Sequence, residues 1–176
     1  MMDVAVEGDC WGIAFFQHTF ILGFRSSPPR VVRMSVEGEV LNTLSYDSSG
    51  NTLFSCPSYI HVANTTDSAR ILVLDHGNKT VYMLDVDLQL LQAFQLPSGG
   101  IPYGLAAVGG GQVLVLVGEW RTMTLQLLDL TTGRWQTLLG EERLRQAISL
   151  VYNQARKQLC VGGWGDYDVK VYALSE

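Results

Sequence analysis

Residues 70–85 read RILVLDHGNKTVYMLD. Two runs rich in apolar and β-branched residues flank a short polar segment, Asp75 to Thr80. An Asp beside a His is a common catalytic pairing, whereas Gly and Asn between two apolar runs are typical of a turn between strands. The rest of the chain favours one of these two interpretations.

The same pattern recurs along the sequence. Short alternating runs begin at Val32, Val81, Leu125 and Val169, so successive units are 44 to 49 residues apart. A second apolar run precedes each of these by 10 to 12 residues, a third precedes the second, and a fourth follows in the first three units. Gly, Asn, Asp and Pro separate the runs, and almost nothing has a helical period. Four short strands per unit of this length are typical of a β-propeller blade.

The sequence therefore predicts an all-β fold, a β-propeller of about four four-stranded antiparallel blades in one domain, residues 1–176. The predicted blades are residues 11–47, 59–96, 101–139 and 147–174. The fourth unit has three runs, and residues 3–7 form one more short alternating run. In a closed ring residues 3–7 would complete the last blade, and in part of a six-bladed ring they would end a lost blade. An incomplete ring leaves apolar blade faces partly exposed, which favours self-association through exposed blade edges.

Two segments resemble a known repeat. Residues 10–14 (CWGIA) and 101–106 (IPYGLA) resemble the start of an NHL repeat, and residues 70–85 resemble its body. The resemblance covers most of the chain and is best at 59–96 and 101–139. NHL propellers commonly close with six blades and often form the C-terminal module of tripartite-motif proteins, whose RING domain at the other end carries ubiquitin-ligase activity. This chain has no RING, B-box or coiled coil, so the resemblance implies partner recognition without a ligase activity of its own.

In this frame residues 75–80 join the second and third strands of the second blade, and the turn interpretation is favoured over catalysis. Gly77 and Asn78 are expected to supply the positive φ of a tight turn. Loops in the same position of all four blades are expected to share one face of the disc. Trp and Arg side chains most often carry interface energy, and this loop set contains several. The predicted partner-binding residues are Arg25, Arg30, His76, Lys79, Trp120, Arg121, Trp164 and Tyr167. Two of them, Trp120 and Trp164, occupy matching positions, and covering apolar blade edges is the alternative role for both.

Other chemistries find little support. His18 and His76 fall in turns expected on opposite faces of the propeller, where they could not share one ion, and His61 falls in an inner strand, so no metal site is predicted. The inner strands carry no acid for a calcium-dependent hydrolase. Cys56 has no partnering His in the sequence, so a structural thiol is expected and no catalytic residue or cofactor is assigned.

Composition limits the remaining function classes. Apolar residues make up 47% and charged residues 16% of the chain, which indicates a globular domain. A net charge of −5 disfavours RNA and membrane surfaces. Three cysteines without a zinc spacing, and no signal-peptide pattern, indicate a cytoplasmic protein with reduced thiols. The predicted function is a non-catalytic scaffold that binds a protein or peptide. An RNA-binding NHL propeller is the alternative, with the loop arginines as its basis, and a propeller hydrolase or lyase comes third.

Overall fold

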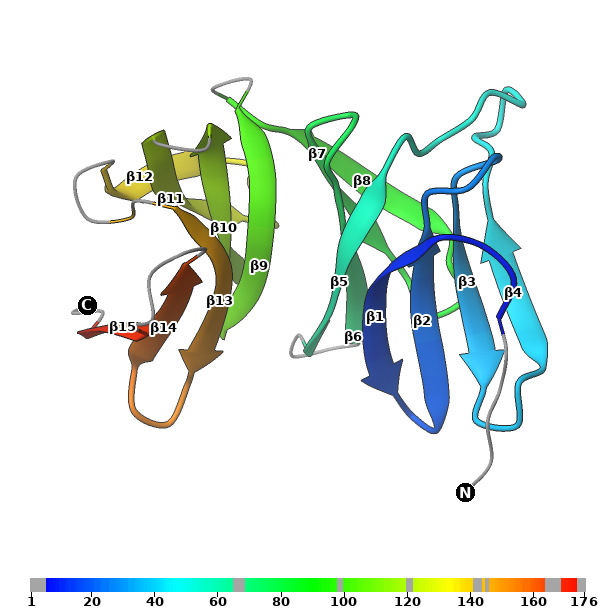
Figure 1. Ribbon diagram of the computed structural model, residues 1–176, viewed down its shortest axis with the longest axis horizontal. Helices are drawn as coiled ribbons and strands as arrows, with labels where there is room; N and C mark the ends of the chain where they lie inside the picture. Colours follow the sequence, from blue (N-terminus) through cyan, green and yellow to red (C-terminus); the bar gives the residue numbers. More distant parts are fainter. Residues whose placement is uncertain are drawn as a thin grey trace. The chain divides into compact units, whose positions relative to one another are not determined.

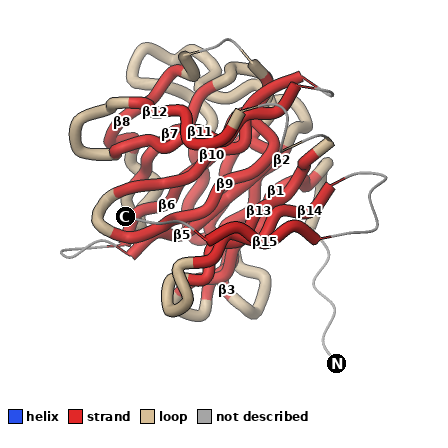
Figure 2. Tube along the Cα trace, turned by 90° about the vertical axis from the view of Figure 1, so that its left-hand side faces the viewer, coloured by secondary structure: helices blue, strands red, loops and turns tan. Residues whose placement is uncertain are grey.

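The structure, a computed structural model, describes residues 6–64, 69–97, 100–119, 122–140, 144, 146–163 and 169–173. These residues form strands, turns and loops and no helix (Figures 1 and 2). Consequently no described segment forms a helix that is long and apolar enough to cross a membrane.

The strands form four antiparallel sheets, here called blades 1 to 4, in which strands adjacent in sequence pair with each other (Figure 1). Blade 1 contains β1 (Cys10–Phe16), β2 (Thr19–Phe24), β3 (Arg30–Ser35) and β4 (Val40–Leu44). Blade 2 contains β5 (Pro57–Asn64), β6 (Ala69–Asp75), β7 (Thr80–Leu84) and β8 (Leu90–Gln95). Blade 3 contains β9 (Ile101–Gly109), β10 (Gln112–Glu119), β11 (Thr122–Asp129) and β12 (Trp135–Leu139). Blade 4 contains β13 (Ala147–Asn153), β14 (Gln158–Gly163) and β15 (Val169–Ala173).

The predicted all-β fold of four antiparallel, mostly four-stranded sheets is thus confirmed. Blade 4 has three strands among the described residues. The predicted closing strand, residues 3–7, falls mainly on residues outside the described part of the chain. Of that run only Val6 and Glu7 are described, and neither is in a strand.

The chain divides into two compact units. Unit 1 (Met1–Asn64 and Ser68–Gln95) contains blades 1 and 2, and unit 2 (Thr65–Asp67 and Leu96–Glu176) contains blades 3 and 4. In each unit a core lies between the two blades, because alternate side chains of each strand point to the facing blade.

In unit 1, Ile21 and Val31 of blade 1 pack with Ile71, Val73 and Leu84 of blade 2, all fully buried. The first strands of the two blades approach closely, which requires glycine on β1 and β2. A Cβ at Gly12 would lie 3.0 Å from the Ser58 carbonyl oxygen, and one at Gly23 would collide with that of Pro57. The Gly of the CWGIA motif is therefore a packing residue between blades.

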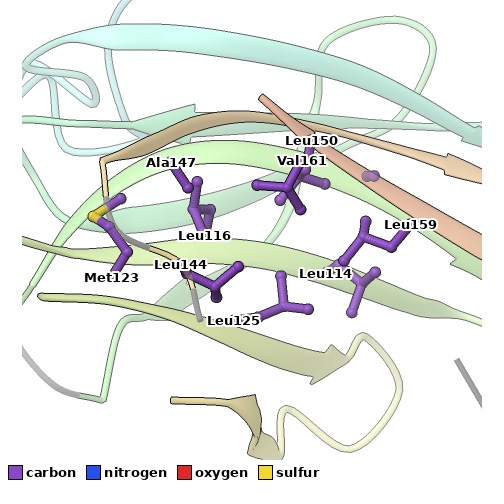
Figure 3. Packing of buried hydrophobic residues seen from close by; sticks show 10 residues of the cluster. Leu114, Leu116, Met123, Leu125, Leu144, Ala147, Leu150, Leu159 and Val161 are labelled. Carbon is purple, nitrogen blue, oxygen red and sulfur yellow. The ribbon is translucent and has the colours of Figure 1, made fainter. Parts of the chain in front are cut away.

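In unit 2, side chains of β10 and β11 meet those of β13 and β14. Leu114, Leu116 and Leu125 are fully buried against Leu150 and Leu159 (Figure 3). Met123, Leu144, Ala147 and Val161 belong to the same cluster and are labelled in this view, and Ala106 is its tenth member. The alternating apolar pattern that defined the repeat in the sequence is the pattern that fills this core.

In blades 1 to 3 the turn after the third strand is closed by a short polar side chain. Ser35 Oγ accepts from the amides of Glu37 and Glu39, and Asp85 Oδ1 from those of Asp87 and Gln89. Asp129 Oδ1 accepts from Thr131 and Thr132. Short polar side chains stabilise such turns by bonding backbone amides two to four residues ahead. The equivalence of Ser35, Asp85 and Asp129 fixes the alignment of the blades residue by residue.

Candidate functional site

Asp75, at the end of β6, is a structural anchor of unit 1. It is fully buried. Its carboxylate accepts the backbone amides of Ser55 at 2.8 Å, Cys56 at 3.0 Å and Asn78 at 2.8 Å. A buried carboxylate requires such donors. Asp75 therefore joins the β6–β7 turn to the loop that leads into β5, and all of its bonds go to backbone.

Asn78 extends this network to the blade 2 core. Its side-chain amide donates to the Leu53 carbonyl and to the Tyr82 hydroxyl, both at 3.0 Å. The Tyr82 hydroxyl in turn donates to the Leu53 carbonyl at 2.9 Å. Residues 76–79 form the connection between β6 and β7, so the turn interpretation of the opening stretch is confirmed.

The expected source of positive φ in this turn is wrong. Lys79 has φ of 55°, whereas neither Gly77 nor Asn78 has a positive φ. Gly77 is required for another reason, because a Cβ there would collide with the Ser55 side chain. The turn packs directly on residues 55–56, a long-range contact that local turn rules do not include.

Arg25 lies at the start of the β2–β3 connection and stacks on an indole. Its guanidinium carbon is 4.4 Å from the centre of the Trp11 ring. Asp9 holds both groups, since its carboxylate accepts from Trp11 Nε1 at 2.9 Å and from Arg25 Nε at 3.1 Å. Arg25 Nη2 lies 3.0 Å from the same carboxylate. The result is an exposed aromatic–cation cluster, Asp9–Trp11–Arg25, whose members are joined by hydrogen bonds and an ion pair.

Arg30 is the first residue of β3 and lies over a second aromatic ring, that of Phe24, at 4.5 Å. Its guanidinium donates to the Glu7 carbonyl at 3.1 Å and, at 3.4 Å, to Ser26 Oγ and the Pro28 carbonyl. These bonds join Arg30 to Glu7 and to residues 26 and 28 of the β2–β3 connection, so Arg30 stabilises the loop that begins at Arg25.

Cys56 lies between the two predicted loops of unit 1. Burial raises the pKa of its thiol, the charge of Asp75 raises it further, and the charge of Arg25 opposes the rise. The Cys56 carbonyl accepts the His76 amide at 2.9 Å. Arg25 and His76, which are 51 positions apart in the sequence numbering, are therefore brought to the same region around Cys56. At neutral pH this cysteine is a thiol and not a thiolate nucleophile.

Half of the predicted site lies outside the described residues. Trp120 and Arg121 fall between β10 and β11, and Trp164 and Tyr167 between β14 and β15, so their grouping stays a prediction. Of the others, Arg25, His76 and Lys79 lie in the two second-to-third-strand connections of unit 1, and Arg30 borders the first.

Sequence reasoning did not assign Asp9 and Trp11 to this surface. Trp11 was placed with the first strand as part of the repeat motif, and Asp9 was not assigned a role. Trp11 belongs to β1 but is 51% exposed, which is high for a large aromatic residue. The D-C-W sequence before the glycine of the motif was the available signal, although nothing local links it to Arg25.

Metal ligands do not gather in the described part of the chain, where no three His, Cys, Asp or Glu residues form a group. Burial lowers the pKa of His61 on β5. Burial also lowers the pKa of His76, and Asp75 opposes that shift. Both imidazoles are therefore mainly neutral at pH 7.

An exposed apolar strip lies on blade 1. Gly12 and Ala14 of β1 face blade 2. Ile13 and Phe15 alternate with them on the opposite face and are 64% and 60% exposed. Blade 4 has a comparable face, where Val151 and Val171 both pair with Cys160 and are 64% and 56% exposed.

Unit 2 contains a groove of about 670 Å³ between blades 3 and 4. Its apolar walls are Val108, Leu114, Leu127, Leu138, Leu139 and Tyr152. Gln112, Gln136 and Lys157 contribute the polar groups. This is a second candidate binding surface, and the sequence pattern gave no indication of it.

No protein-family model and no curated protein matches the sequence. Solved structures do match. The computationally designed protein Ika4 shares 14% identity over 97% of this chain and 94% of its own, with a TM-score of 0.64. The β-propeller domain of Cps50 (Swd1) from Myceliophteria thermophila shares 11% identity over 94% of this chain and 54% of its own, with a TM-score of 0.66.

The fold is a β-propeller fold. A chain in a nidogen/laminin complex is also similar, with 16% identity over 93% of this chain and 60% of its own, and a TM-score of 0.72. This propeller chain thus spans little more than half the length of those two natural chains. Identities this low establish the fold alone. These matches do not identify the chain as an NHL-repeat protein.

Proposed function

We propose that this propeller is a non-catalytic interaction module that binds a protein or peptide through the loop surface of unit 1 around Arg25. The observation that carries the proposal is the Asp9–Trp11–Arg25 cluster. Trp11 and the Arg25 side chain are 51% and 49% exposed, yet each is held by Asp9.

Preorganisation is the physical reason to prefer this surface. A partner that packs on a mobile arginine or tryptophan must first immobilise it, at a cost in entropy. Here the cost has been met within the free protein by the bonds to Asp9. Trp and Arg are also the residues that most often act as interface hot spots. The isolated ion pair adds little stability because it is exposed, so recognition is the better explanation for the arrangement.

Two further features agree with an interaction module. One similar chain comes from a complex of two proteins, nidogen and laminin. The Asp75 carboxylate accepts backbone amides and the Asn78 side chain donates to a backbone carbonyl, which supports a structural and non-enzymatic role for Asp75.

The finer proposal rests on the repeat resemblance. Residues 70–85 and the CWGIA motif resemble an NHL repeat, so we infer that the module recognises substrates or partners for a cytoplasmic, tripartite-motif-like ubiquitin ligase. Its test is whether partners captured through Arg25 become ubiquitylated in cells in a manner that the Arg25→Ala variant abolishes.

Partner capture from cell extract tests the broader proposal. Proteins retained by the wild-type chain should not be retained by Arg25→Ala or by Trp11→Ala. Once a partner is identified, each substitution should weaken its binding to this chain by about 2 kcal/mol or more. Arg156→Ala is the matched control, because Arg156 is an exposed arginine in the β13–β14 turn. Equal retention of all partners by the four proteins would contradict the site.

RNA binding is tested in the same set. Arg25 is paired with Asp9 and the chain carries a net charge of −5, which leaves little attraction for phosphates. A salt titration with single-stranded RNA should show no affinity even at low ionic strength. Affinity that falls steeply with salt and with Arg25→Ala would favour the RNA alternative.

A further inference from the structure

Two of the three cysteines stand at the beginning of adjacent strands in unit 1. Cys10 is the first residue of β1, and Cys56 immediately precedes β5. These are the first strands of blades 1 and 2, and they lie side by side and point the same way (Figure 1). Both cysteines are free thiols, of which Cys10 is exposed and Cys56 is half-buried.

A glycine brings these two strands into backbone contact and sets their register. A Cβ at Gly12 would lie only 3.0 Å from the Ser58 carbonyl oxygen. Gly12 is two residues after Cys10, and Ser58 is two residues after Cys56. Because the strands run in the same direction, two steps back along each from the Gly12–Ser58 contact lead to the two cysteines. The register therefore places Cys10 and Cys56 at the same level of neighbouring strands.

The Cys10 thiol points toward this contact between the blades. It donates to the Gly12 carbonyl oxygen, with Sγ at 3.6 Å. Burial raises the pKa of this thiol, and hydrogen bonds with the backbone of Gly12 and Gly23 oppose that rise. A Cβ at Gly23 would collide with the carbonyl oxygen of Pro57, the residue that follows Cys56. The Cys10 thiol thus borders the backbone groups on which the Cys56 segment packs.

One carboxylate acts on both thiols. Burial raises the pKa of the Cys10 thiol, and the charge of Asp9 adds to the rise. Burial and the charge of Asp75 raise the pKa of the Cys56 thiol, and Asp9 again adds to the rise. Because Coulomb interactions weaken with distance, both sulfur atoms lie in the neighbourhood of the same Asp9 carboxylate. This agrees with the register that the glycine contact imposes.

We propose that Cys10 and Cys56 form a reversible disulfide bond that joins blade 1 to blade 2 when the surrounding glutathione pool becomes oxidised. A disulfide needs Cα atoms within about 7 Å of each other, a separation that neighbouring strands in backbone contact can provide. The structure contains the reduced form of the pair. The bond requires no partner protein and goes beyond the proposed function.

The bond forms by thiol–disulfide exchange with oxidised glutathione. The exposed Cys10 thiol loses its proton, and its thiolate attacks one sulfur of the glutathione disulfide and releases one glutathione thiolate. The Cys56 thiolate then attacks the Cys10 sulfur of this mixed disulfide and releases the second. Two protein thiols are oxidised, one glutathione disulfide is reduced to two thiols, and the two protons pass to the released glutathione thiolates. Because burial raises the pKa of both cysteines, the exchange should be slow at neutral pH and faster at higher pH.

The bond constrains the loop surface and the unfolded chain together. Cys10 lies between Asp9 and Trp11 of the aromatic–cation cluster, so a bridge to Cys56 ties that cluster to the loop before β5. The two cysteines are 46 positions apart (56 − 10). A crosslink across a segment of this length restricts the unfolded chain, so oxidation should raise the melting temperature by about 5–10 °C.

Peptide mapping of the full chain tests the pairing. Trypsin leaves Cys10 in residues 1–25, Cys56 in residues 34–70 and Cys160 in residues 158–170. The folded chain is incubated with excess oxidised glutathione at about pH 8, where more of each thiol is ionised. Mass spectrometry should then find peptide 1–25 linked to peptide 34–70 as the main disulfide product. Electrophoresis without reductant should show a monomer, and dithiothreitol should separate the two peptides.

Cysteine variants provide the controls. Cys160→Ser removes the thiol of unit 2 and should keep both the linked peptides and the full rise in melting temperature. Cys10→Ser and Cys56→Ser should each abolish both. Neither cysteine is buried in the core, so both variants should fold. The comparison of the oxidised and reduced wild-type chain needs no variant and keeps the test valid if one of them does not.

Three results would overturn the proposal. One is a folded chain that yields no link between peptides 1–25 and 34–70, or yields it only in urea or only in dimers. Another is a link from Cys160 to either cysteine that is as abundant as the link between Cys10 and Cys56. The third is a bond that forms and lowers the melting temperature, since the native positions of the two cysteines would then not suit a bridge. None of these results bears on partner binding, because no partner enters the experiment.

Discussion

The hydrogen bonds of the Asp75 carboxylate distinguish a catalytic role for this residue from a structural one. A general base needs a carboxylate oxygen available to a substrate, but in this protein both oxygens accept backbone amides from residues 55, 56 and 78. The neighbouring His76 donates its backbone amide to the Cys56 carbonyl, in the loop that leads into β5. The Asp75–His76 pair, which resembled a catalytic pair in the sequence, joins the β6–β7 turn to the loop that leads into β5.

Asp75→Ala should lower the free energy of unfolding by about 3 kcal/mol, because it leaves three amides without their acceptor in a buried position. His76→Ala, the control beside it, should change that energy by less than about 1 kcal/mol. Urea unfolding of both variants measures the difference. A large loss for His76→Ala with little for Asp75→Ala would show that the anchor has been misassigned.

His61 gives the protein a predictable pH dependence. Burial lowers its pKa in the folded state below the unfolded value of about 6.5. The unfolded chain therefore binds protons first, and stability that is fully present above about pH 6.5 falls as the pH drops from there toward the folded pKa. His76 acts in the same direction.

Urea unfolding at about pH 7.5 and about pH 5 should show this fall in the wild-type chain and a smaller fall in His61→Gln. The remaining decrease in the variant reports the other groups, including His76. Identical pH profiles for the two proteins would mean that His61 is not desolvated in the folded state.

At the level of strands, the contact between neighbouring blades depends on glycines. Gly23 of β2 and Gly104 of β9 each lie beside the first strand of the following blade, but the space differs. A Cβ at Gly23 would collide with the Pro57 carbonyl, whereas one at Gly104 would lie 3.5 Å from atoms of Leu150, an ordinary contact.

Gly23→Ala should therefore destabilise the chain by about 1–3 kcal/mol, as overpacking of a rigid backbone contact does. Gly104→Ala should have little effect. Thermal melting of the pair provides the comparison. If both variants melt alike, the close approach of blades 1 and 2 at Gly23 is not a constraint on the fold.

The strands were predictable because their signal is local. Continuous apolar runs rich in Val and Ile at residues 71–74 and 113–116, bounded by turn residues, are typical of strands buried on both faces. The site was less predictable because its contacts are not local. Asp9 bonds to Arg25 sixteen residues away, and Asp75 to Ser55 twenty residues away. Gly77 illustrates the difference. Its place in the turn was predicted from the sequence, whereas the reason that a glycine is needed there, close contact with Ser55, was not.

The groove of unit 2 shows the same limit from another side. Residues 114, 127 and 136 occupy ordinary strand positions of blade 3, and nothing in their spacing in the sequence predicts a cavity. The groove appears only in the folded chain, where side chains of blades 3 and 4 line it together.

At the scale of the whole molecule, the exposed apolar strip of blade 1 should control association. Ile13 and Phe15 are 64% and 60% exposed. From the size of such side chains they leave on the order of 200 Å² of apolar surface in one strip. Exposed apolar strips on soluble proteins often mark contact sites.

The chain should accordingly form dimers or larger species in a concentration-dependent manner, and Ile13→Lys should shift it toward the monomer by placing a charge in the strip. Val40→Lys is the matched control, because Val40 is 62% exposed on β4, the strand at the opposite edge of the same sheet from β1.

Sedimentation velocity over a range of concentrations measures the weight-average sedimentation coefficient of all three proteins. Ile13→Lys should lower it at high concentration, and Val40→Lys should not. A wild-type chain that stays monomeric throughout, or equal shifts for both variants, would mean that the strip is not an association surface.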